Sequence, residues 1–158
     1  MTENPEMRGC LIPKNLHYRV DDHTWVRVQE DGTVWVGMTD VAQTMAGPLL
    51  HVKTRGVGTQ REKGKPLATV ESAKWVGPVK SPVSGEIVEV NPKVAQNAEV
   101  VSHSPYGQGW IVRMKPVNLQ AELAEMLTGD AAVAAYQQKI DKEKLKTCVH
   151  VEGFEGEG

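Results

Sequence analysis

The chain has 158 residues, the size of one ordinary domain, and it can bury a core without metals or disulfides. Its 18 basic and 20 acidic residues give a formal net charge of -2, and no block of lysine or arginine could neutralise a run of phosphates. We therefore expect a single domain over residues 1–158 that binds no nucleic acid.

The N-terminal segment MTENPEMRGC is polar, and no later stretch has the length and hydropathy of a membrane span. This pattern predicts a cytoplasmic protein with no membrane partner. The two cysteines, Cys10 and Cys148, lie near opposite ends of the chain and are too few for a disulfide framework. We expect them to be ordinary thiols in a reducing compartment.

Short valine-rich runs, each closed by glycine, proline or aspartate, fill residues 18–114 and predict a mainly β domain. The clearest unit is a β-hairpin in which Trp25–Val28 and Thr33–Val36 alternate on either side of an Asp-Gly turn. A second hairpin rises through residues 67–70, turns near residues 71–74 and returns through residues 75–79. The segments GEIVEVN and GWIVRMK predict two further strands.

A short helix or turn is expected between these hairpins. Val41, Met45 and Leu49 share one helical face, and Asp40 is placed to cap the helix. The Gly-Pro pair at residues 47–48 should end it early.

The spacing of apolar residues changes after Pro116. One helical stripe is formed by Leu119, Leu123, Met126 and Leu127. Asn118 can cap this helix and Gly129 can end it. A second, alanine-rich helix is predicted over residues 131–146 with Asp130 as its cap. We thus expect a β-sandwich core over residues 12–116, helices over 117–146, and a disordered tail over 152–158.

Two lysines, Lys74 and Lys80, lie in the second hairpin, and Lys74 falls at its turn. A lysine on a rigid turn presents its amine in one geometry, which lowers the ordering cost for a modifying enzyme. Most lysines are only solvated surface charges, so the surrounding sequence must decide whether this one has a function.

That sequence, VESAKWVGPVKSPVSGEIVEVN, resembles the lipoyl-attachment segment of glycine cleavage system H proteins, whose pattern is close to VESVKAxSDxxxPVSGxVxEVN. Lys74 takes the place of the lipoylated lysine. By this analogy Glu71 and Gly85 guide recognition by lipoylating enzymes, and Lys74 alone has both at the expected offsets.

The resemblance extends over most of residues 12–137. HTWV, VGMTDVAQ and SPYGQGW correspond to HEWV, VGIT-x-x-A-Q and DPYGEGW. The fold it implies is a flattened barrel-sandwich hybrid of the lipoyl and biotin carrier type, mainly β, with peripheral helices that include two at the C-terminus. It also implies covalent lipoate as the cofactor. Since no nucleophile and base pair is apparent, we expect a carrier that serves as a substrate of partner enzymes and is not itself an enzyme.

Three positions depart from the H-protein pattern. Thr24 and Pro78 replace acids, and Met45 stands where a histidine is common. Together with Trp75 and Val76, these changes make the expected surroundings of the arm more apolar, which disfavours a cationic amine.

The changes resemble those in lipoate-binding proteins of sulfur oxidisers. That resemblance implies an arm that shuttles a sulfur-bearing intermediate and electrons, with a heterodisulfide-reductase-like complex and dihydrolipoamide dehydrogenase as partners. The alternative is a glycine cleavage H protein that carries the aminomethyl group between glycine decarboxylase and aminomethyltransferase.

A metal or redox site built from Cys10, His17, Cys148 and His150 is a third hypothesis. Cys148 and His150 alternate along an extended segment and could place two ligands on one side. The chain has no paired CxxC unit, so we expect buried or idle thiols and no bound metal.

Overall fold

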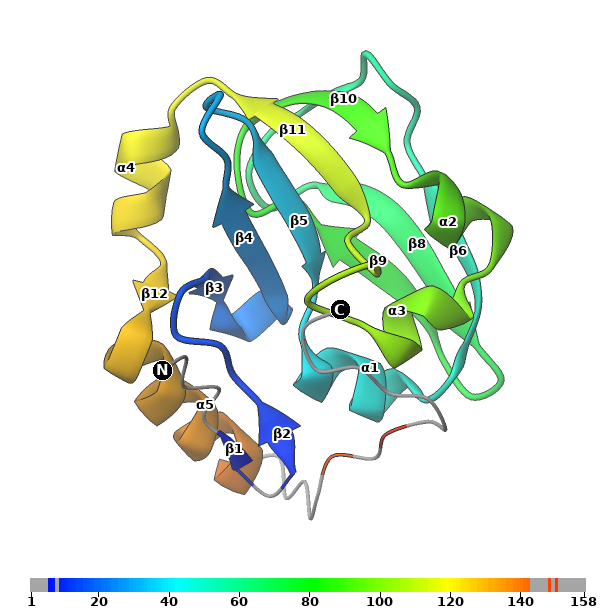
Figure 1. Cartoon of the computed structure of the whole chain (residues 1–158), viewed down its shortest axis with the longest axis vertical. Helices are drawn as coiled ribbons and strands as arrows, with labels where there is room; N and C mark the ends of the chain where they lie inside the picture. The colour runs from blue at the N-terminus through cyan, green and yellow to red at the C-terminus, as the bar shows by residue number, and fades with distance from the viewer. Residues whose placement is uncertain (1–5, 8, 143–147, 149, 151–158) are drawn as a thin grey trace.

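The structure of the chain is a computed structural model that describes residues 6–7, 9–142, 148 and 150. Its largest element is a seven-stranded antiparallel sheet (Figure 1). In spatial order the strands are β12 (Leu127–Thr128), β3 (His17–Arg19), β4 (Thr24–Val28), β5 (Val34–Met38), β11 (Val112–Pro116), β10 (Gly85–Val90) and β7 (Gln60–Arg61).

A three-stranded sheet lies behind the larger one in the view of Figure 1. Its strands are β6 (Leu49–Thr54), β8 (Pro66–Ser72) and β9 (Val76–Lys80), with β8 in the centre. One buried apolar cluster combines Val36 and Ile87 of the large sheet with Val70 and Val79 of the small one. The expected barrel-sandwich fold is confirmed.

The first predicted hairpin is confirmed as β4 and β5, with Val26 opposite Val36. Gly32 in the turn has a φ of +86°, a conformation that glycine adopts without strain. The indole N–H of buried Trp25 donates to the carbonyl of Met38 at 3.0 Å and to that of Pro105 at 2.9 Å. This indole therefore fixes the end of the hairpin to the loop before β11.

The predicted short helix is α1 (Asp40–Ala46), but its cap differs from the expectation. Thr39 is the N-cap, and its hydroxyl accepts the Ala42 N–H at 3.2 Å. Asp40 is the first helical residue and is fully buried, because its carboxylate is used in tertiary contacts. Gly47, at a φ of +81°, ends the helix as predicted, so Leu49 belongs to β6.

Three short helical segments were not predicted from the sequence: η1 (Val20–Asp22), α2 (Pro92–Gln96) and α3 (Glu99–His103). A start signal for α2 is present, since the Asn91 side chain accepts the Lys93 N–H at 3.0 Å ahead of a proline at the first helical position. Segments of this length show no clear helical periodicity.

The C-terminal helices differ from the expectation at their boundaries. α4 (Leu119–Ala124) follows Asn118, which makes no side-chain cap bond, and it ends before Gly129. Leu127–Thr128 forms β12 because β3 offers a partner strand. α5 (Gly129–Lys142) then begins at Gly129.

The predicted extension of this last helix over 143–146 and the predicted disordered tail at 152–158 lie outside the described residues. Within the described ranges, no helix is long and apolar enough to span a membrane.

The expectation of two thiols is wrong. Cys10, in the two-residue strand β2 (Cys10–Leu11) that pairs with β1 (Glu6–Met7), forms a disulfide with Cys148 across a Cα–Cα distance of 5.0 Å. Because the two cysteines are not free thiols, they no longer support the expectation of a reducing compartment.

The disulfide also removes the thiolate ligands of the metal hypothesis, and His17 lies in β3 opposite Val26. No group of three or more His, Cys, Asp and Glu side chains within the described part of the chain could hold a metal ion.

We predict that the double variant Cys10→Ser/Cys148→Ser is less stable than the oxidised protein. The disulfide closes a sequence separation of 138 residues. Its removal should lower the free energy of unfolding by about 2–5 kcal/mol. Chemical denaturation without reductant measures this, and wild type treated with dithiothreitol serves as the matched control. Identical midpoints for the oxidised protein and the variant would contradict the prediction.

Candidate functional site

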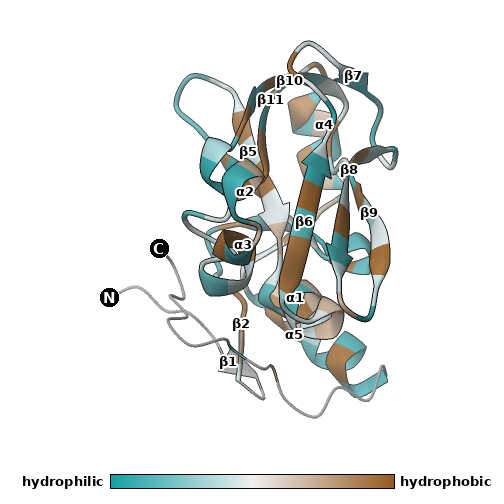
Figure 2. Cartoon of the chain, turned by 90° about the vertical axis from the view of Figure 1, so that its right-hand side faces the viewer, coloured by the Kyte–Doolittle hydropathy of each residue, from teal (hydrophilic) through white to brown (hydrophobic). Residues whose placement is uncertain are grey.

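Lys74 lies in the tight turn between β8 and β9, as the sequence predicts. The Ser72 N–H donates to the Trp75 carbonyl at 2.8 Å and closes the turn. The buried Ser72 hydroxyl donates to the Ala46 carbonyl at the end of α1. The turn is thus attached to α1, and Figure 2 shows the two elements next to each other.

The Lys74 side chain is exposed and lies over Gly47. A Cβ atom added to Gly47 would lie 3.1 Å from Lys74 Cε, so the absence of a side chain there makes room for the lysine stem. The backbone at the end of α1 thus supports the methylene chain of Lys74, and its amine remains accessible to a modifying enzyme.

The Trp75 ring folds back over Gly77 in β9. A Cβ atom added to Gly77 would collide with this ring. Trp75 is 41% exposed, so the ring forms part of the surface beside Lys74.

A pocket of about 220 Å³ opens next to this turn. It lies between the ends of the two sheets and is lined by Asp22, His23, Thr24, Met38, Ala42, Met45, Ala46, Trp75, Pro78 and Val79. Four of the residues singled out from the sequence meet here: Thr24, Met45, Trp75 and Pro78. The lining is mostly apolar, which agrees with the expected surroundings of the arm.

Val76 is the exception among the residues expected around the arm. It lines a different hollow, of about 620 Å³, together with Leu50 of β6 and Glu71 of β8. Side chains alternate between the two faces of a strand, so Val76 and Val79, three residues apart in β9, need not share a face. Val79 is buried while Val76 is exposed.

Thr24 contributes an unusual group to the pocket. The residue is 1% exposed, and none of the described residues forms a hydrogen bond with its hydroxyl. A buried hydroxyl without a partner is unfavourable, and a polar group of a ligand in the pocket could satisfy it.

Sequence reasoning missed Asp22 and His23, which also line the pocket. One Asp22 oxygen lies 3.3 Å from Arg19 Nε and the other lies 3.9 Å from Lys80 Nζ. His23, with a φ of +58°, is the one non-glycine residue with positive φ in the described ranges. Their positions directly before Thr24 could have suggested them, since they end the turn that leads into β4.

Glu71 and Gly85 occupy different environments. Glu71 is exposed on β8, opposite His51, three residues before Lys74. Gly85 is buried in the other sheet, where an added Cβ atom would collide with the Lys115 carbonyl. Glu71 is therefore accessible to a partner enzyme, whereas Gly85 is required for the pairing of β10 with β11. Their roles in lipoylation stay predictions.

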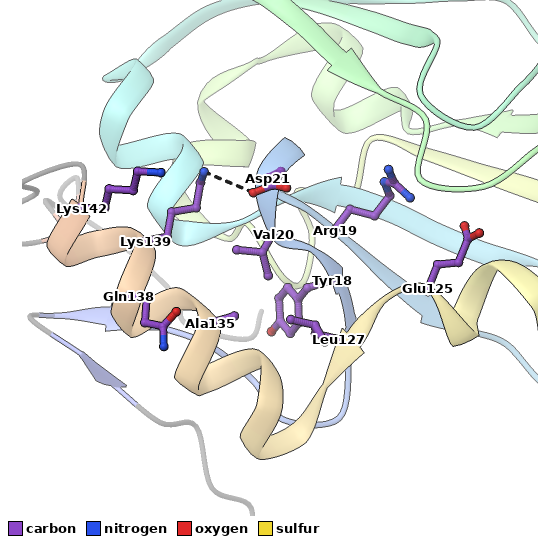
Figure 3. A pocket seen from close by; sticks show the side chains of 10 residues that line it. All are labelled: Tyr18, Arg19, Val20, Asp21, Glu125, Leu127, Ala135, Gln138, Lys139 and Lys142. Atoms are coloured by element: carbon purple, nitrogen blue, oxygen red, sulfur yellow. Dashed lines mark ion pairs between the residues drawn. The ribbon is translucent and has the colours of Figure 1, made fainter.

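A third hollow, of about 390 Å³, lies between α5 and β3 (Figure 3). Its rim carries Arg19, Lys139 and Lys142 as well as Asp21 and Glu125, and Lys139 lies 3.6 Å from Asp21. The charges of opposite sign give it no single preference for an anion or a cation. It shares no lining residue with the pocket beside Lys74.

The family model for the glycine cleavage H-protein matches residues 17–140. The chain belongs to the glycine cleavage H-protein family. "Glycine cleavage system H protein 3" of Aquifex aeolicus is 51% identical over 140 residues, which cover 87% of each chain. "Probable glycine cleavage system H protein 2" of Sulfurisphaera tokodaii is 47% identical over 140 residues, which cover 87% of this chain and 94% of the relative.

The crystal structure of a glycine cleavage system H protein from Mycobacterium marinum superposes with a TM-score of 0.70 at 34% identity. The match covers 81% of this chain and 99% of that one. Proteins of this H-protein family are lipoyl carriers and not catalysts, and the present chain is a carrier of the same type.

We predict that Ser72→Ala loosens the turn that presents Lys74. The substitution removes the buried hydroxyl that joins this turn to Ala46. It should lower the free energy of unfolding by about 1–2 kcal/mol. Denaturant titration tests the stability, and Ser84→Ala, whose hydroxyl bonds to Glu122 away from the turn, is a matched control.

The Ser72→Ala variant should also show faster amide exchange at Lys74 and Trp75 than the Ser84→Ala variant. Equal exchange in these two variants would show that the hydroxyl does not hold the turn.

Proposed function

We propose that Lys74 is the attachment site for lipoate and that the chain shuttles a lipoyl-bound group between partner enzymes. The observation that carries this proposal is an exposed lysine on a turn attached to α1, directly beside a pocket lined mostly by apolar side chains. Bound lipoate supplies a dithiolane, a two-electron disulfide whose sulfurs can carry a group.

The residues around Lys74 fit such an arm. Gly47 makes room for the lysine stem, and the Trp75 ring provides an apolar surface next to it. Part of the pocket lining is buried, including Met38 and Ala42, and the buried Thr24 hydroxyl offers one polar contact inside it. These residues would bind, orient and shelter the end of the arm, while chemistry takes place on partner enzymes.

For the cargo, we propose first the aminomethyl group of glycine cleavage. The family match and the names of the relatives support this choice. The carboxylate of Asp22 supports it as well, because an acid in the lining can stabilise a cationic amine. The partners would then be lipoylating enzymes, glycine decarboxylase and aminomethyltransferase.

A sulfur-bearing cargo is the second candidate. The observation in its favour is the lining of the pocket, where Met45 and Pro78 are apolar and Asp22 already lies near two cationic side chains. An uncharged or sulfur-bearing group is less costly to bury there than an ammonium group. In this case a heterodisulfide-reductase-like complex and dihydrolipoamide dehydrogenase would be the partners.

We predict that a lipoyl ligase adds one lipoyl group to the chain and that the group is on Lys74. Intact mass before and after treatment measures the number of additions. Lys74→Arg should abolish the addition, whereas Lys80→Arg should keep it, because Lys80 lies at the far end of β9. An addition retained in Lys74→Arg would overturn the assignment of the site.

We predict that the cargo can be read from the lipoylated Lys74 peptide. One preparation is incubated with glycine decarboxylase and glycine, and another, with the arm reduced, is incubated with thiosulfate as a sulfane-sulfur donor. Mass spectrometry then compares the adducts. Aminomethyl loading without a sulfur adduct supports the glycine cleavage cargo, and the reverse result supports the sulfur cargo.

Two variants test whether a carboxylate in the pocket stabilises the cationic amine. Asp22→Asn should reduce aminomethyl loading, and Pro78→Asp should increase it, because an acid within about 4–6 Å favours a charged amine. Glu89→Gln, an acid paired with Arg113 on another strand, is the matched control. Loading that is equal in all three variants would show that the pocket does not bind the amine.

A further inference from the structure

Cys148 and His150, the two described residues after α5, contact β2 and α1, and we call these contacts the C-terminal clamp. The first contact is the disulfide of Cys148 with Cys10. The second is the pair between His150 Nε2 and the Asp40 carboxylate, at 2.8 and 3.0 Å. Residues near the two ends of the chain therefore meet at the start of α1.

Asp40 connects the clamp to several other elements. Its buried carboxylate accepts the Leu11 N–H of β2 at 2.8 Å and the Gln43 side-chain N–H at 2.7 Å. Its own backbone N–H donates to the Tyr106 hydroxyl, which in turn donates to the Leu11 carbonyl. Burial, with smaller contributions from Tyr18 and Asp40, raises the pKa of Tyr106 well above its ordinary value, so this hydroxyl keeps its proton.

The two faces of α1 belong to different parts of the protein. Val41 packs in the apolar cluster that contains Cys10 and Cys148. Ala42 and Ala46 belong to the main core cluster and line the pocket beside Lys74. Ala46 also accepts the hydroxyl bond that holds the Lys74 turn. If the start of α1 becomes disordered, the residues of the same short helix that line the pocket can therefore lose their fixed positions as well.

We propose that Cys10 and Cys148 form a reversible redox site whose reduction releases the C-terminal clamp and loosens α1 and the pocket that it lines. This inference does not rest on the proposed cargo. α1 has only seven residues, and a helix of this length depends on tertiary contacts for its order. Release of Cys148 and His150 removes the pair between His150 and Asp40 in its first turn and disturbs the apolar cluster that Val41 shares with the disulfide.

The reductant is a dithiol. Its two sulfurs lose two electrons and two protons and join in a disulfide, while the bond between Cys10 and Cys148 breaks and each cysteine becomes a thiol. Cys10 is fully buried and Cys148 is 7% exposed, so a dithiol attacks after a local opening around the disulfide, and Cys148 is the more accessible of the two cysteines. The clamp is therefore reduced slowly in the closed state and rapidly once it has opened.

Amide hydrogen exchange of the unmodified full chain tests the proposal, with dithiothreitol as the dithiol. After reduction, verified by intact mass, the amides of Gln43 and Gly47 in and after α1 should exchange about tenfold faster or more. These amides bond to Thr39 and Gln43 carbonyls in the closed state. The amides of β4 and β5 provide an internal reference, because core strands open at up to the global free energy of unfolding. After reduction, the free energy of opening should be lower in α1 than in β4 and β5.

Matched variants separate the disulfide from other effects of reductant. Cys10→Ser/Cys148→Ser should exchange in α1 like the reduced protein, with or without dithiothreitol. His150→Ala keeps the disulfide and should accelerate exchange in α1 by a smaller factor. Unchanged exchange in α1 after verified reduction would show a purely structural disulfide and overturn the proposal. Equal free energies of opening in α1 and in β4 and β5 after reduction would also overturn it, since α1 would then open only when the whole protein unfolds.

These exchange measurements use the chain without lipoate. Their outcome therefore does not depend on whether the lipoyl proposals are correct. A Lys74→Arg variant should show the same response to reduction as the wild type. The two proposals can therefore succeed or fail separately.

Discussion

The attachment of the Lys74 turn to α1 through Ser72 and Ala46 is the contact on which the presentation of the lysine depends. A two-stranded hairpin alone is only marginally stable in water, and its tip would sample many orientations. Here the tip is bonded to the end of a helix whose start is fixed by the buried Asp40 carboxylate. One short helix thus joins the turn, the pocket and the chain ends, and its order determines how well the lysine and the pocket are placed relative to each other.

Much of the site could be predicted because its signals are local. The alternation of apolar residues and the turn residues define the hairpin around Lys74, and the strand period of two fixes which residues face the core. The sequence motifs, and not the periodicity, indicated Thr24, Met45 and Pro78 as neighbours of the arm. All three line one pocket although they come from β4, α1 and β9.

The features that could not be predicted depend on contacts between distant parts of the chain. Asp40 is a good N-cap by its residue type, but its carboxylate bonds to Leu11 and His150 and Thr39 takes the cap instead. Leu127 fits a helical stripe, but it pairs with Tyr18 as a strand. The disulfide could not be predicted for the same reason, because 138 residues separate its two cysteines and no spacing rule connects them.

The ion pairs of Asp22 affect how strongly the pocket prefers one cargo over the other. A cationic amine that binds Asp22 competes with Lys80, whose ammonium lies 3.9 Å away on a half-exposed side chain. Pairs of this kind contribute about 0–1 kcal/mol, so the competition is weak. Arg19, at 3.3 Å, is a closer competitor. An uncharged sulfur cargo leaves both pairs intact and fills the apolar part of the lining. The pocket can therefore accommodate either cargo at modest cost, and selectivity has to come mainly from which partner enzyme engages the turn around Lys74.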